Sequence, residues 1–327
     1  MECRMTESNE GPVRVRTAAE MADYDSAGEQ DHSTPLARAT EQSLWARSGQ
    51  RSRPPAPRPA ATRVFVVANQ KGGVGKTTST VNVAAGLAQL GQRVLVIDLD
   101  PQGNASTALN VEHRQGTASV YDALVEGTPL EEIMVPCPDV PDLFVVPATI
   151  DLAGAEIELV SVVARENRLS KAIAAHPRIG AAAALGEDRF DYVIIDCPPS
   201  LGLLTLNALV AGEEMMIPIQ AEYYALEGLS QLLATVDMVR AHLNPALAIS
   251  TILVTMYDAR TRLAAGVAEE VRAHFGEQVL RTMIPRSVRV SEAPSYAQTV
   301  VTYDPGSSGA LSYLEAAREI AAKGVTS

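Results

Sequence analysis

From about residue 63 to the end of the chain, short apolar runs alternate with stretches in which apolar residues recur at helical spacing. The short runs are rich in β-branched residues and predict buried strands, and the helical spacing predicts amphipathic helices. The predicted strands lie within residues 63–69, 92–100, 142–148, 190–196, 213–220 and 249–256. The predicted helices cover residues 77–91, 153–175, 225–243 and 264–275. This alternation predicts a doubly wound, mostly parallel α/β sheet with helices on both faces.

The first 62 residues carry no such periodicity. They are rich in Glu, Ser, Arg and Pro and end in RSRPPAPRPAATR, so they cannot bury enough apolar surface to offset the entropy of ordering. We therefore expect a disordered N-terminal tail over residues 1–62 and one folded domain over residues 63–327. The arginines after Glu41 could contact DNA or a partner, but a solvated linker is the simpler interpretation. The Ala/Gly-rich stretch 176–188 predicts a small surface excursion.

The composition limits the possible classes of protein. The chain has 327 residues and a net charge of −12, from 27 basic and 39 acidic residues. No apolar run reaches the roughly 18 residues of a membrane span, and the first residues lack the apolar centre of a secretory signal. The three cysteines are too widely spaced for a disulfide framework or a metal cluster. We expect a cytoplasmic protein that could contact DNA only through a local basic patch.

A glycine-rich stretch, NQKGGVGKTT (residues 69–78), connects the first predicted strand to the first predicted helix. The backbone N–H groups of such a turn converge on phosphate oxygens, and the helix N-terminus adds partial positive charge. We expect Lys76 to reach the β- and γ-phosphates of a nucleotide and Thr77 to offer its hydroxyl to Mg²⁺. A chance glycine turn is disfavoured because both the strand and the helix are evident. Lys71, five residues before Lys76, has no obvious role in a loop of this kind.

Three aspartates stand at the ends of predicted strands. Asp98 and Asp100 close the strand in VLVIDLDPQGN, and Asp196 closes the strand in FDYVIIDCPPS. The carboxyl ends of strands are the edge at which open α/β sheets bind ligands. Each aspartate alone could be a strand cap or could form an Asx turn. Three of them beside one phosphate loop indicate a metal and nucleotide site.

The order of these motifs resembles a known family. KGGVGKTT, with its extra lysine, followed by DLDPQGN and IIDCPPS, is similar to the P-loop NTPases with a deviant Walker A motif. Within that group, EYYALEGLSQLL (222–233) and IPRSVRVSEAPSYAQ (284–298) resemble the ParA/Soj family of chromosome-partitioning ATPases. The resemblance runs from about Arg63 to the C-terminus, which predicts a fold of P-loop NTPase type.

The resemblance also implies ligands and roles. It implies ATP and Mg²⁺, a slow and partner-stimulated ATPase, and a homodimer that forms in the ATP state. Lys71 would then reach across the dimer to the partner's nucleotide, where a second cation stabilises phosphate charge. Asp100 would position the attacking water and complete a catalytic set with both lysines, while Asp98 and Asp196 would serve Mg²⁺ together with Thr77. The expected nucleotide contacts are Gly72, Gly73, Val74, Gly75, Lys76, Thr77 and Thr78.

Family members of this short type bind double-stranded DNA non-specifically. By resemblance the DNA contacts are Arg260 and Arg289, with Arg286 and Arg262 nearby. Arginines on loops can bind phosphates without reading bases. The alternative is that these arginines pair with acids, and Glu292 lies close to two of them. A ParB-like centromere-binding partner and association with the nucleoid are implied in the same way.

Three alternatives keep part of this interpretation. A MinD-like membrane ATPase needs a C-terminal amphipathic helix with bulky apolar residues, and ALSYLEAAREIAAKGVTS is only mildly amphipathic, so no stable membrane association is expected. An iron–sulfur reductase of the nitrogenase type needs paired cysteines, and Cys137 and Cys197 lack that setting. A ParA-like ATPase could instead position a chemoreceptor array, a carboxysome or conjugative machinery. SVRVSEAPS favours chromosome partition.

Overall fold

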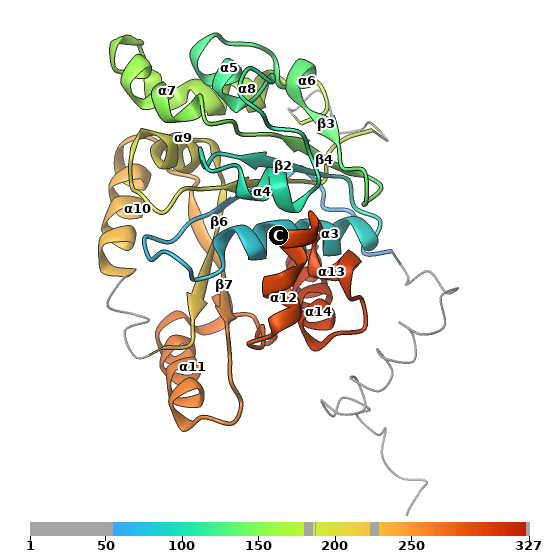
Figure 1. The fold of residues 1–327 in the computed structure, drawn as a ribbon. Helices are drawn as coiled ribbons and strands as arrows, with labels where there is room; N and C mark the ends of the chain where they lie inside the picture. Colours follow the sequence, from blue (N-terminus) through green and yellow to red (C-terminus); the bar gives the residue numbers. More distant parts are fainter. Residues whose placement is uncertain (1–54, 180–185, 187, 223–228, 325–327) are drawn as a thin grey trace, which may run out of the picture. The chain divides into compact units, whose positions relative to one another are not determined.

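The computed structural model describes residues 55–179, 186, 188–222 and 229–324 (Figure 1). The strands are β1 Arg63–Val67, β2 Val94–Asp98, β3 Val135–Pro136, β4 Leu143–Val146, β5 Tyr192–Asp196, β6 Glu214–Gln220 and β7 Ala248–Thr255. The helices are α3 Lys76–Gln89, α4 Asn104–Ala108, α5 Val120–Val125, α6 Leu130–Ile133, α7 Leu152–Glu158, α8 Arg168–Ala175, α9 Leu203–Ala211, α10 Ser230–His242, α11 Arg262–Phe275, α12 Val288–Glu292, α13 Val300–Tyr303 and α14 Ser308–Lys323. Short 3₁₀ turns are η1 Leu159–Ser161, η2 Arg165–Asn167, η5 Gly276–Gln278 and η6 Ala293–Tyr296.

The strands form one sheet in the order β3-β4-β2-β5-β1-β6-β7. Every pair in it is parallel except β3 with β4, which is antiparallel. The six strands expected from the sequence are all present, so the doubly wound α/β prediction is confirmed. The sequence missed β3, because two exposed residues, one of them a proline, are too few to produce an alternating pattern.

Alternate residues of the central strands feed two separate cores. Val66, Ile97 and Ile195 belong to the core that α5, α7, α8, α9 and α10 cover, together with α11. Val67 and Val96 face the other core, which α3, α13 and α14 cover, and the same layering is visible in Figure 1. Burial on both faces explains why the strands read as continuous apolar runs. The phosphate loop lies between β1 and α3, at the carboxyl edge of this sheet.

The expected continuous helix over residues 153–175 is wrong. The structure divides it into α7, η1, η2 and α8. Ala164 takes a left-handed conformation with φ of 53°, which no helix interior accommodates. Val160 and Val163 flank the break and are exposed. Apolar residues therefore continue through the break, which is why the pattern concealed it.

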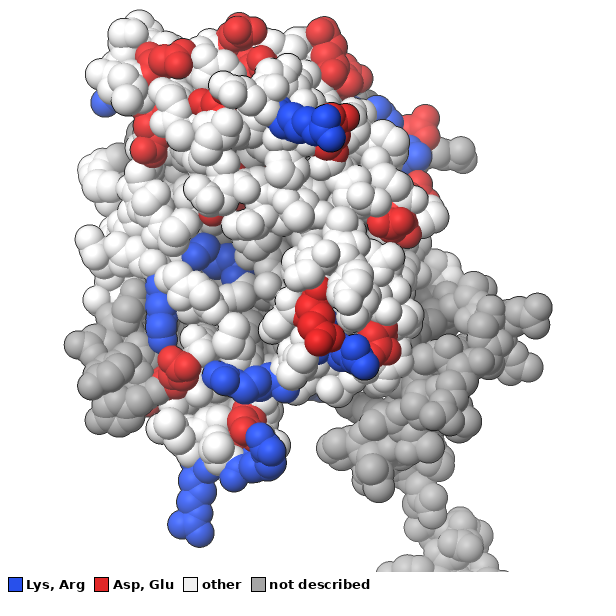
Figure 2. Space-filling model, viewed as in Figure 1, with Lys and Arg blue, Asp and Glu red and all other residues white. Residues whose placement is uncertain are grey.

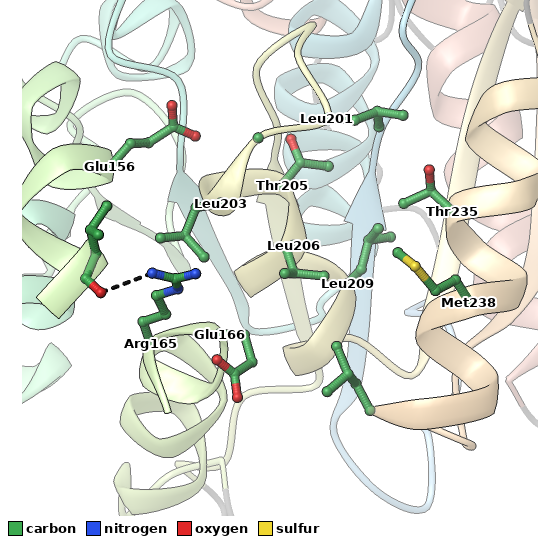
Figure 3. A pocket seen from close by; sticks show the side chains of 13 residues that line it. Glu156, Arg165, Glu166, Leu201, Leu203, Thr205, Leu206, Leu209, Thr235 and Met238 are labelled. Carbon is green, nitrogen blue, oxygen red and sulfur yellow. Dashed lines mark hydrogen bonds between the residues drawn. The ribbon is translucent and has the colours of Figure 1, made fainter. Parts of the chain in front are cut away.

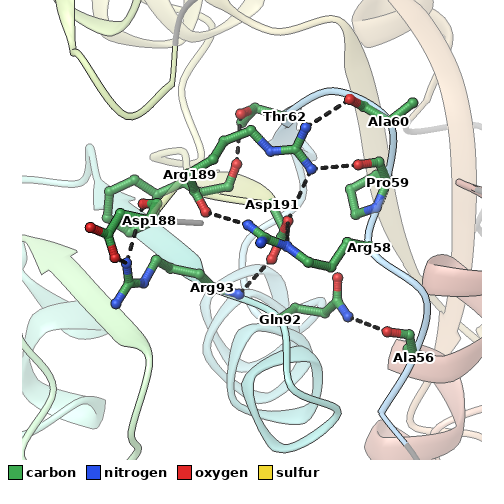
Figure 4. A network of polar contacts seen from close by, with 11 residues as sticks. Ala56, Arg58, Pro59, Ala60, Thr62, Gln92, Arg93, Asp188, Arg189 and Asp191 are labelled. Atoms are coloured by element: carbon green, nitrogen blue, oxygen red, sulfur yellow. Dashed lines mark hydrogen bonds and ion pairs between the residues drawn. The ribbon is translucent and has the colours of Figure 1, made fainter. Parts of the chain in front are cut away.

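Residues 55–62, which the sequence pattern places in the tail, lie against the amino edge of the sheet (Figure 4). Backbone and side-chain hydrogen bonds join them to the residues before β2 and β5. The rest of the expected tail, residues 1–54, lies outside the described residues, as do residues 180–185 and 187 of the expected excursion and residues 223–228. Among the described helices, none is both long and apolar enough to cross a bilayer.

Candidate functional site

The glycine-rich loop has the backbone of a phosphate cradle. Gly73 and Gly75 have φ of 74° and 89°, in the left-handed region that favours glycine. Gly75 precedes the first turn of α3 and leaves its N–H groups without a side-chain cap. The far side of the loop is braced, because Thr255 Oγ1 donates to the carbonyl oxygen of Val74 at 2.8 Å. The loop therefore holds its donors in place before any anion arrives.

Lys76 is the buried cation of this cradle. It is only 8% exposed, and burial lowers the pKa of its ammonium, although the charges of Asp196 and Asp100 oppose that shift. The contact recorded for its Nζ is a long one, 3.4 Å to the carbonyl oxygen of Lys71. A buried ammonium whose neutral acceptor is this distant is suited to an incoming phosphate.

Asp196 and two threonines form the second part of the site. Thr77 Oγ1 donates to one carboxylate oxygen of Asp196 at 2.7 Å, and Thr80 Oγ1 donates to the other at 2.8 Å. Asp196 is fully buried, and burial raises its pKa to about 7, with the nearby charge of Asp98 adding to the rise and both threonines opposing it. The two threonines fix the orientation of the carboxylate beside the loop.

Asp98 and Asp100 organise the turn after β2. Both Ser106 N–H and Ser106 Oγ donate to Asp98 Oδ2, at 2.8 and 2.7 Å, and the backbone N–H of Asp100 donates to Oδ1 at 3.2 Å. Burial raises the pKa of Asp98 to about 6, and the hydrogen bonds from Ser106 limit the rise. Asp100 is 9% exposed and accepts a hydrogen bond from Gln102 N–H. Asp98 thus orders the segment that carries Asp100, while its role toward Mg²⁺ stays a prediction.

The side chain of Lys71 pairs outside this group, although its backbone carbonyl contacts Lys76. Lys71 Nζ is 3.0 Å from Glu222 Oε2, and its side chain is 39% exposed. Glu222 follows β6 and was not singled out from the sequence. The backbone of Lys71 is fixed by Asn69, whose Oδ1 accepts from its N–H and whose Nδ2 donates to Pro218 O.

The four arginines considered for DNA contact are exposed, and Arg260, Arg286 and Arg289 each have an acidic neighbour. Arg260 is held by Asp258 at 2.8 Å, and this pairing lowers the pKa of Asp258 to about 2. Arg289 contacts Glu292 at 3.1 Å and Asp304 at 3.4 Å. Arg286 lies in the segment before α12, and its Nη2 is 4.0 Å from Glu222 Oε1. Figure 2 shows Lys and Arg gathered over α11 and α12, whereas Asp and Glu predominate over α5 to α7.

The geometry fits a nucleoside triphosphate with Mg²⁺. A Cβ placed on Gly72 or Gly73 would meet nothing within 4 Å, so the loop has open space above its donors. Lys76 supplies a buried cation, and Thr77 with Asp196 supplies oxygens of the type Mg²⁺ prefers. Within the described residues no cluster of three or more His, Cys, Asp or Glu could hold a metal ion.

A separate pocket of about 580 Å³ lies between α7, α9 and α10 (Figure 3). Its lining includes the apolar side chains of Leu206, Leu209 and Met238 and the carboxylates of Glu156 and Glu166. Arg165 Nη1 donates to the carbonyl oxygen of Val160 beside it. The pocket does not include the phosphate loop, so it is not the nucleotide site.

The comparisons agree with the geometry. An AAA domain model matches residues 62–249. The sporulation initiation inhibitor protein Soj of Bacillus subtilis is 52% identical over 80% of this chain and 99% of its own length. The chain belongs to the Soj/ParA family of chromosome-partitioning ATPases. Further relatives are the chromosome-partitioning ATPase Soj of Thermus thermophilus, 49% identical over 81% of this chain and 97% of its own, and the chromosome partitioning protein ParA of Myxococcus xanthus, 49% identical over 79% and 87%.

Solved structures support the fold of this family member. The cobyrinic acid a,c-diamide synthase of Mycobacterium smegmatis, solved with bound ADP and magnesium, is 38% identical and covers 78% of this chain and 92% of its own, with a TM-score of 0.64. The septum site-determining protein MinD of Pyrococcus horikoshii, complexed with Mg-ADP, covers 79% and 96% with a TM-score of 0.61. At 24% identity, MinD shows the shared fold alone.

Proposed function

We propose that this ATPase is a DNA-binding switch of chromosome segregation. ATP with Mg²⁺ binds in the loop, two chains pair across their nucleotides, and the pair holds nucleoid DNA without sequence preference. Hydrolysis, stimulated by a ParB-like centromere-binding protein, then releases the DNA. The observation that carries the proposal is the position of Lys71. Its ammonium pairs with Glu222 and not with the residues around Asp196, and its side chain is partly exposed. The ammonium is therefore accessible to the nucleotide of a second chain.

The residues of one chain divide the work of binding and hydrolysis. Lys76 and the loop N–H groups hold the phosphates, and Thr77 with Asp196 holds Mg²⁺, which neutralises phosphate charge when it is bound. Asp100 lies at the edge of the site on a segment that Asp98 orders, so it can accept a hydrogen bond from the attacking water. Lys71 of one chain supplies the second cation to the phosphates of the other.

DNA binding in this proposal depends on pairing. Each chain offers Arg260, Arg286 and Arg289, and all three sit beside acids that compete with DNA phosphates. A single chain is therefore a weak DNA ligand. Two chains present the patch twice, which raises the affinity without any new type of contact.

The relatives support segregation as the process that uses this switch. Two of them are named as chromosome-partitioning proteins, and both are more similar in sequence than the structure named as a cobyrinic acid a,c-diamide synthase. In the alternative, a ParA-like ATPase that positions another cargo would go through the same proposed cycle of ATP and DNA binding. The two differ in the partner that stimulates hydrolysis, which makes a ParB-like protein the discriminating reagent.

The test is binding to a non-specific duplex with ATP, ADP or no nucleotide. We expect salt-sensitive binding with ATP only, loss of binding in Arg289→Glu, and little change in Arg240→Glu, which alters a paired arginine on α10. Asp100→Ala should keep the protein on DNA with ATP because hydrolysis is blocked. No binding with any nucleotide would exclude the nucleoid mechanism, and normal hydrolysis by Asp100→Ala would refute the role of that carboxylate.

A further inference from the structure

Glu222 is the second residue after β6, and its carboxylate lies between Lys71 and Arg286. The proposed function assigns Lys71 to the nucleotide and Arg286 to DNA. Glu222 Oε2 is 3.0 Å from Lys71 Nζ, and Glu222 Oε1 is 4.0 Å from Arg286 Nη2. Lys71 belongs to the phosphate loop, and Arg286 belongs to the basic surface before α12. One acidic side chain therefore contacts both a nucleotide-directed and a DNA-directed cation.

The contact is built on fixed backbone at both ends. Gln220, the last residue of β6, donates from Nε2 to Glu222 Oε1 at 2.5 Å, and its carbonyl oxygen accepts from Glu222 N–H at 2.8 Å. On the other side, Asn69 ties the backbone of Lys71 to Pro218 of the same strand, as described above. The acid and the lysine are thus both anchored to β6, so their approach follows from the fold rather than from two freely rotating side chains.

The pair is suited to exchange. The side chains of Lys71 and Glu222 are 39% and 46% exposed, so solvent screens their attraction. An ammonium that keeps a carboxylate partner brings almost no net charge to a phosphate, because the two charges cancel at short range. Full electrostatic benefit at the phosphates of a second chain therefore requires Lys71 to leave Glu222.

Building on the proposed function, we propose that Glu222 is a positioning residue that retains Lys71 within its own chain and so sets the threshold for ATP-dependent pairing. Pairing transfers the ammonium of Lys71 from Glu222 to the phosphates of the second chain. The carboxylate is then left to Arg286, which joins nucleotide-driven pairing to a cation of the DNA surface. Nothing covalent changes in this exchange.

The test compares pairing of the full chain in wild type, Glu222→Gln and Glu213→Gln. Glu213 is an exposed acid at the opposite end of the same strand, so its replacement is a matched loss of charge. Sedimentation velocity with Mg²⁺ and a non-hydrolysable ATP analogue gives the protein concentration at half-pairing. For Glu222→Gln we expect that concentration to fall between about twofold and thirtyfold, because each of the two chains loses one exposed ion pair, and for Glu213→Gln we expect no change.

Further readouts separate positioning from a structural effect. The melting temperature and the affinity of the single chain for a fluorescent ATP analogue should match wild type in Glu222→Gln. Its advantage in pairing should shrink as salt is raised, because salt already screens the wild-type pair. Glu222→Asp should restore part of the wild-type threshold. An unchanged or higher concentration at half-pairing in Glu222→Gln would overturn the role of Glu222, whereas wild type that never pairs with the analogue would overturn the proposed function itself.

Discussion

At the scale of single residues, hydroxyl groups hold the two buried aspartates of the site: Thr77 and Thr80 donate to Asp196, and Ser106 donates to Asp98. The sequence marks Thr77 and Asp196, because both stand at fixed places in motifs. Thr80 and Ser106, which hold the two buried aspartates, carry no motif that would mark them. Their roles arise because α3 and α4 bring them beside the ends of β5 and β2, which only the folded chain specifies.

The two threonines on Asp196 should have separable effects. Thr77→Val removes a hydroxyl that faces the site, so most of the extra thermal stability that Mg²⁺ adds to nucleotide binding should disappear. Thr80→Val leaves one buried carboxylate oxygen without its donor, so the free energy of unfolding should fall by about 1–3 kcal/mol while the Mg²⁺ effect remains. Melting curves with ATP analogue, with and without Mg²⁺, measure both. Equal loss of the Mg²⁺ effect in both variants would contradict this division.

His176 predicts a specific pH dependence. It is 3% exposed, its Nδ1 accepts from Arg178 N–H at 3.1 Å, and it packs against Phe190. Burial lowers its pKa, with the charge of Arg178 acting in the same direction and Glu131 opposing it. Below pH 6.5 the unfolded chain therefore takes up a proton at His176 that the folded chain resists. The free energy of unfolding consequently decreases as the pH is lowered.

Asn in place of His176 keeps an acceptor near the position of Nδ1 and cannot titrate. We expect wild type to be the more stable protein at pH 8, with its advantage over His176→Asn shrinking as pH falls from 7 to 5. Urea unfolding of both proteins along that series is the measurement. A difference that is independent of pH would show that this side chain takes up its proton equally well in both states.

At the scale of elements, the strands and the phosphate loop were predictable because each has a local pattern. The segment 55–62 was not, since its contacts are made by single polar groups (Figure 4). Arg58 and Arg189 both reach Asp191, which is 1% exposed, and Arg189 donates to the carbonyl oxygens of Pro59 and Ala60. From the sequence alone, a Pro- and Arg-rich stretch is interpreted as a linker. Its docking becomes evident only when the buried acid that pairs with Arg58 is known.

Loss of the buried carboxylate of Asp191 should therefore reduce the free energy of unfolding far more than loss of an exposed carboxylate. Asp191→Asn leaves the buried guanidinium of Arg189 without a counter-charge, and we expect a loss of about 3–5 kcal/mol in the free energy of unfolding. Asp188→Asn is the matched control, because Asp188 pairs with Arg93 but its side chain is 81% exposed. Chemical denaturation compares them. Similar small losses in both variants would mean that the segment contributes little to the domain.

At the scale of the whole molecule, an acidic chain is proposed to bind a polyanion. The net charge of −12 is spread so that acids predominate over α5 to α7, and basic residues gather over α11 and α12 (Figure 2). The motifs led us to expect a local patch, yet not that Arg260, Arg286 and Arg289 would each already have an acidic neighbour. Those neighbours must give way when DNA binds, which favours weak and reversible binding.

That arrangement fixes the salt dependence expected of the DNA complex. If Arg260, Arg286 and Arg289 each neutralise one phosphate, two paired chains neutralise six, and log affinity should fall against log salt with a slope of about −5. Removing one arginine removes two contacts from the pair, so Arg289→Ala should reduce the slope to about −4. Arg240→Ala, on α10, should leave it unchanged. The measurement is fluorescence anisotropy with an ATP analogue at constant Mg²⁺ over a series of salt concentrations. A slope near zero, or one that Arg289→Ala does not alter, would place the DNA contacts on other residues of the chain.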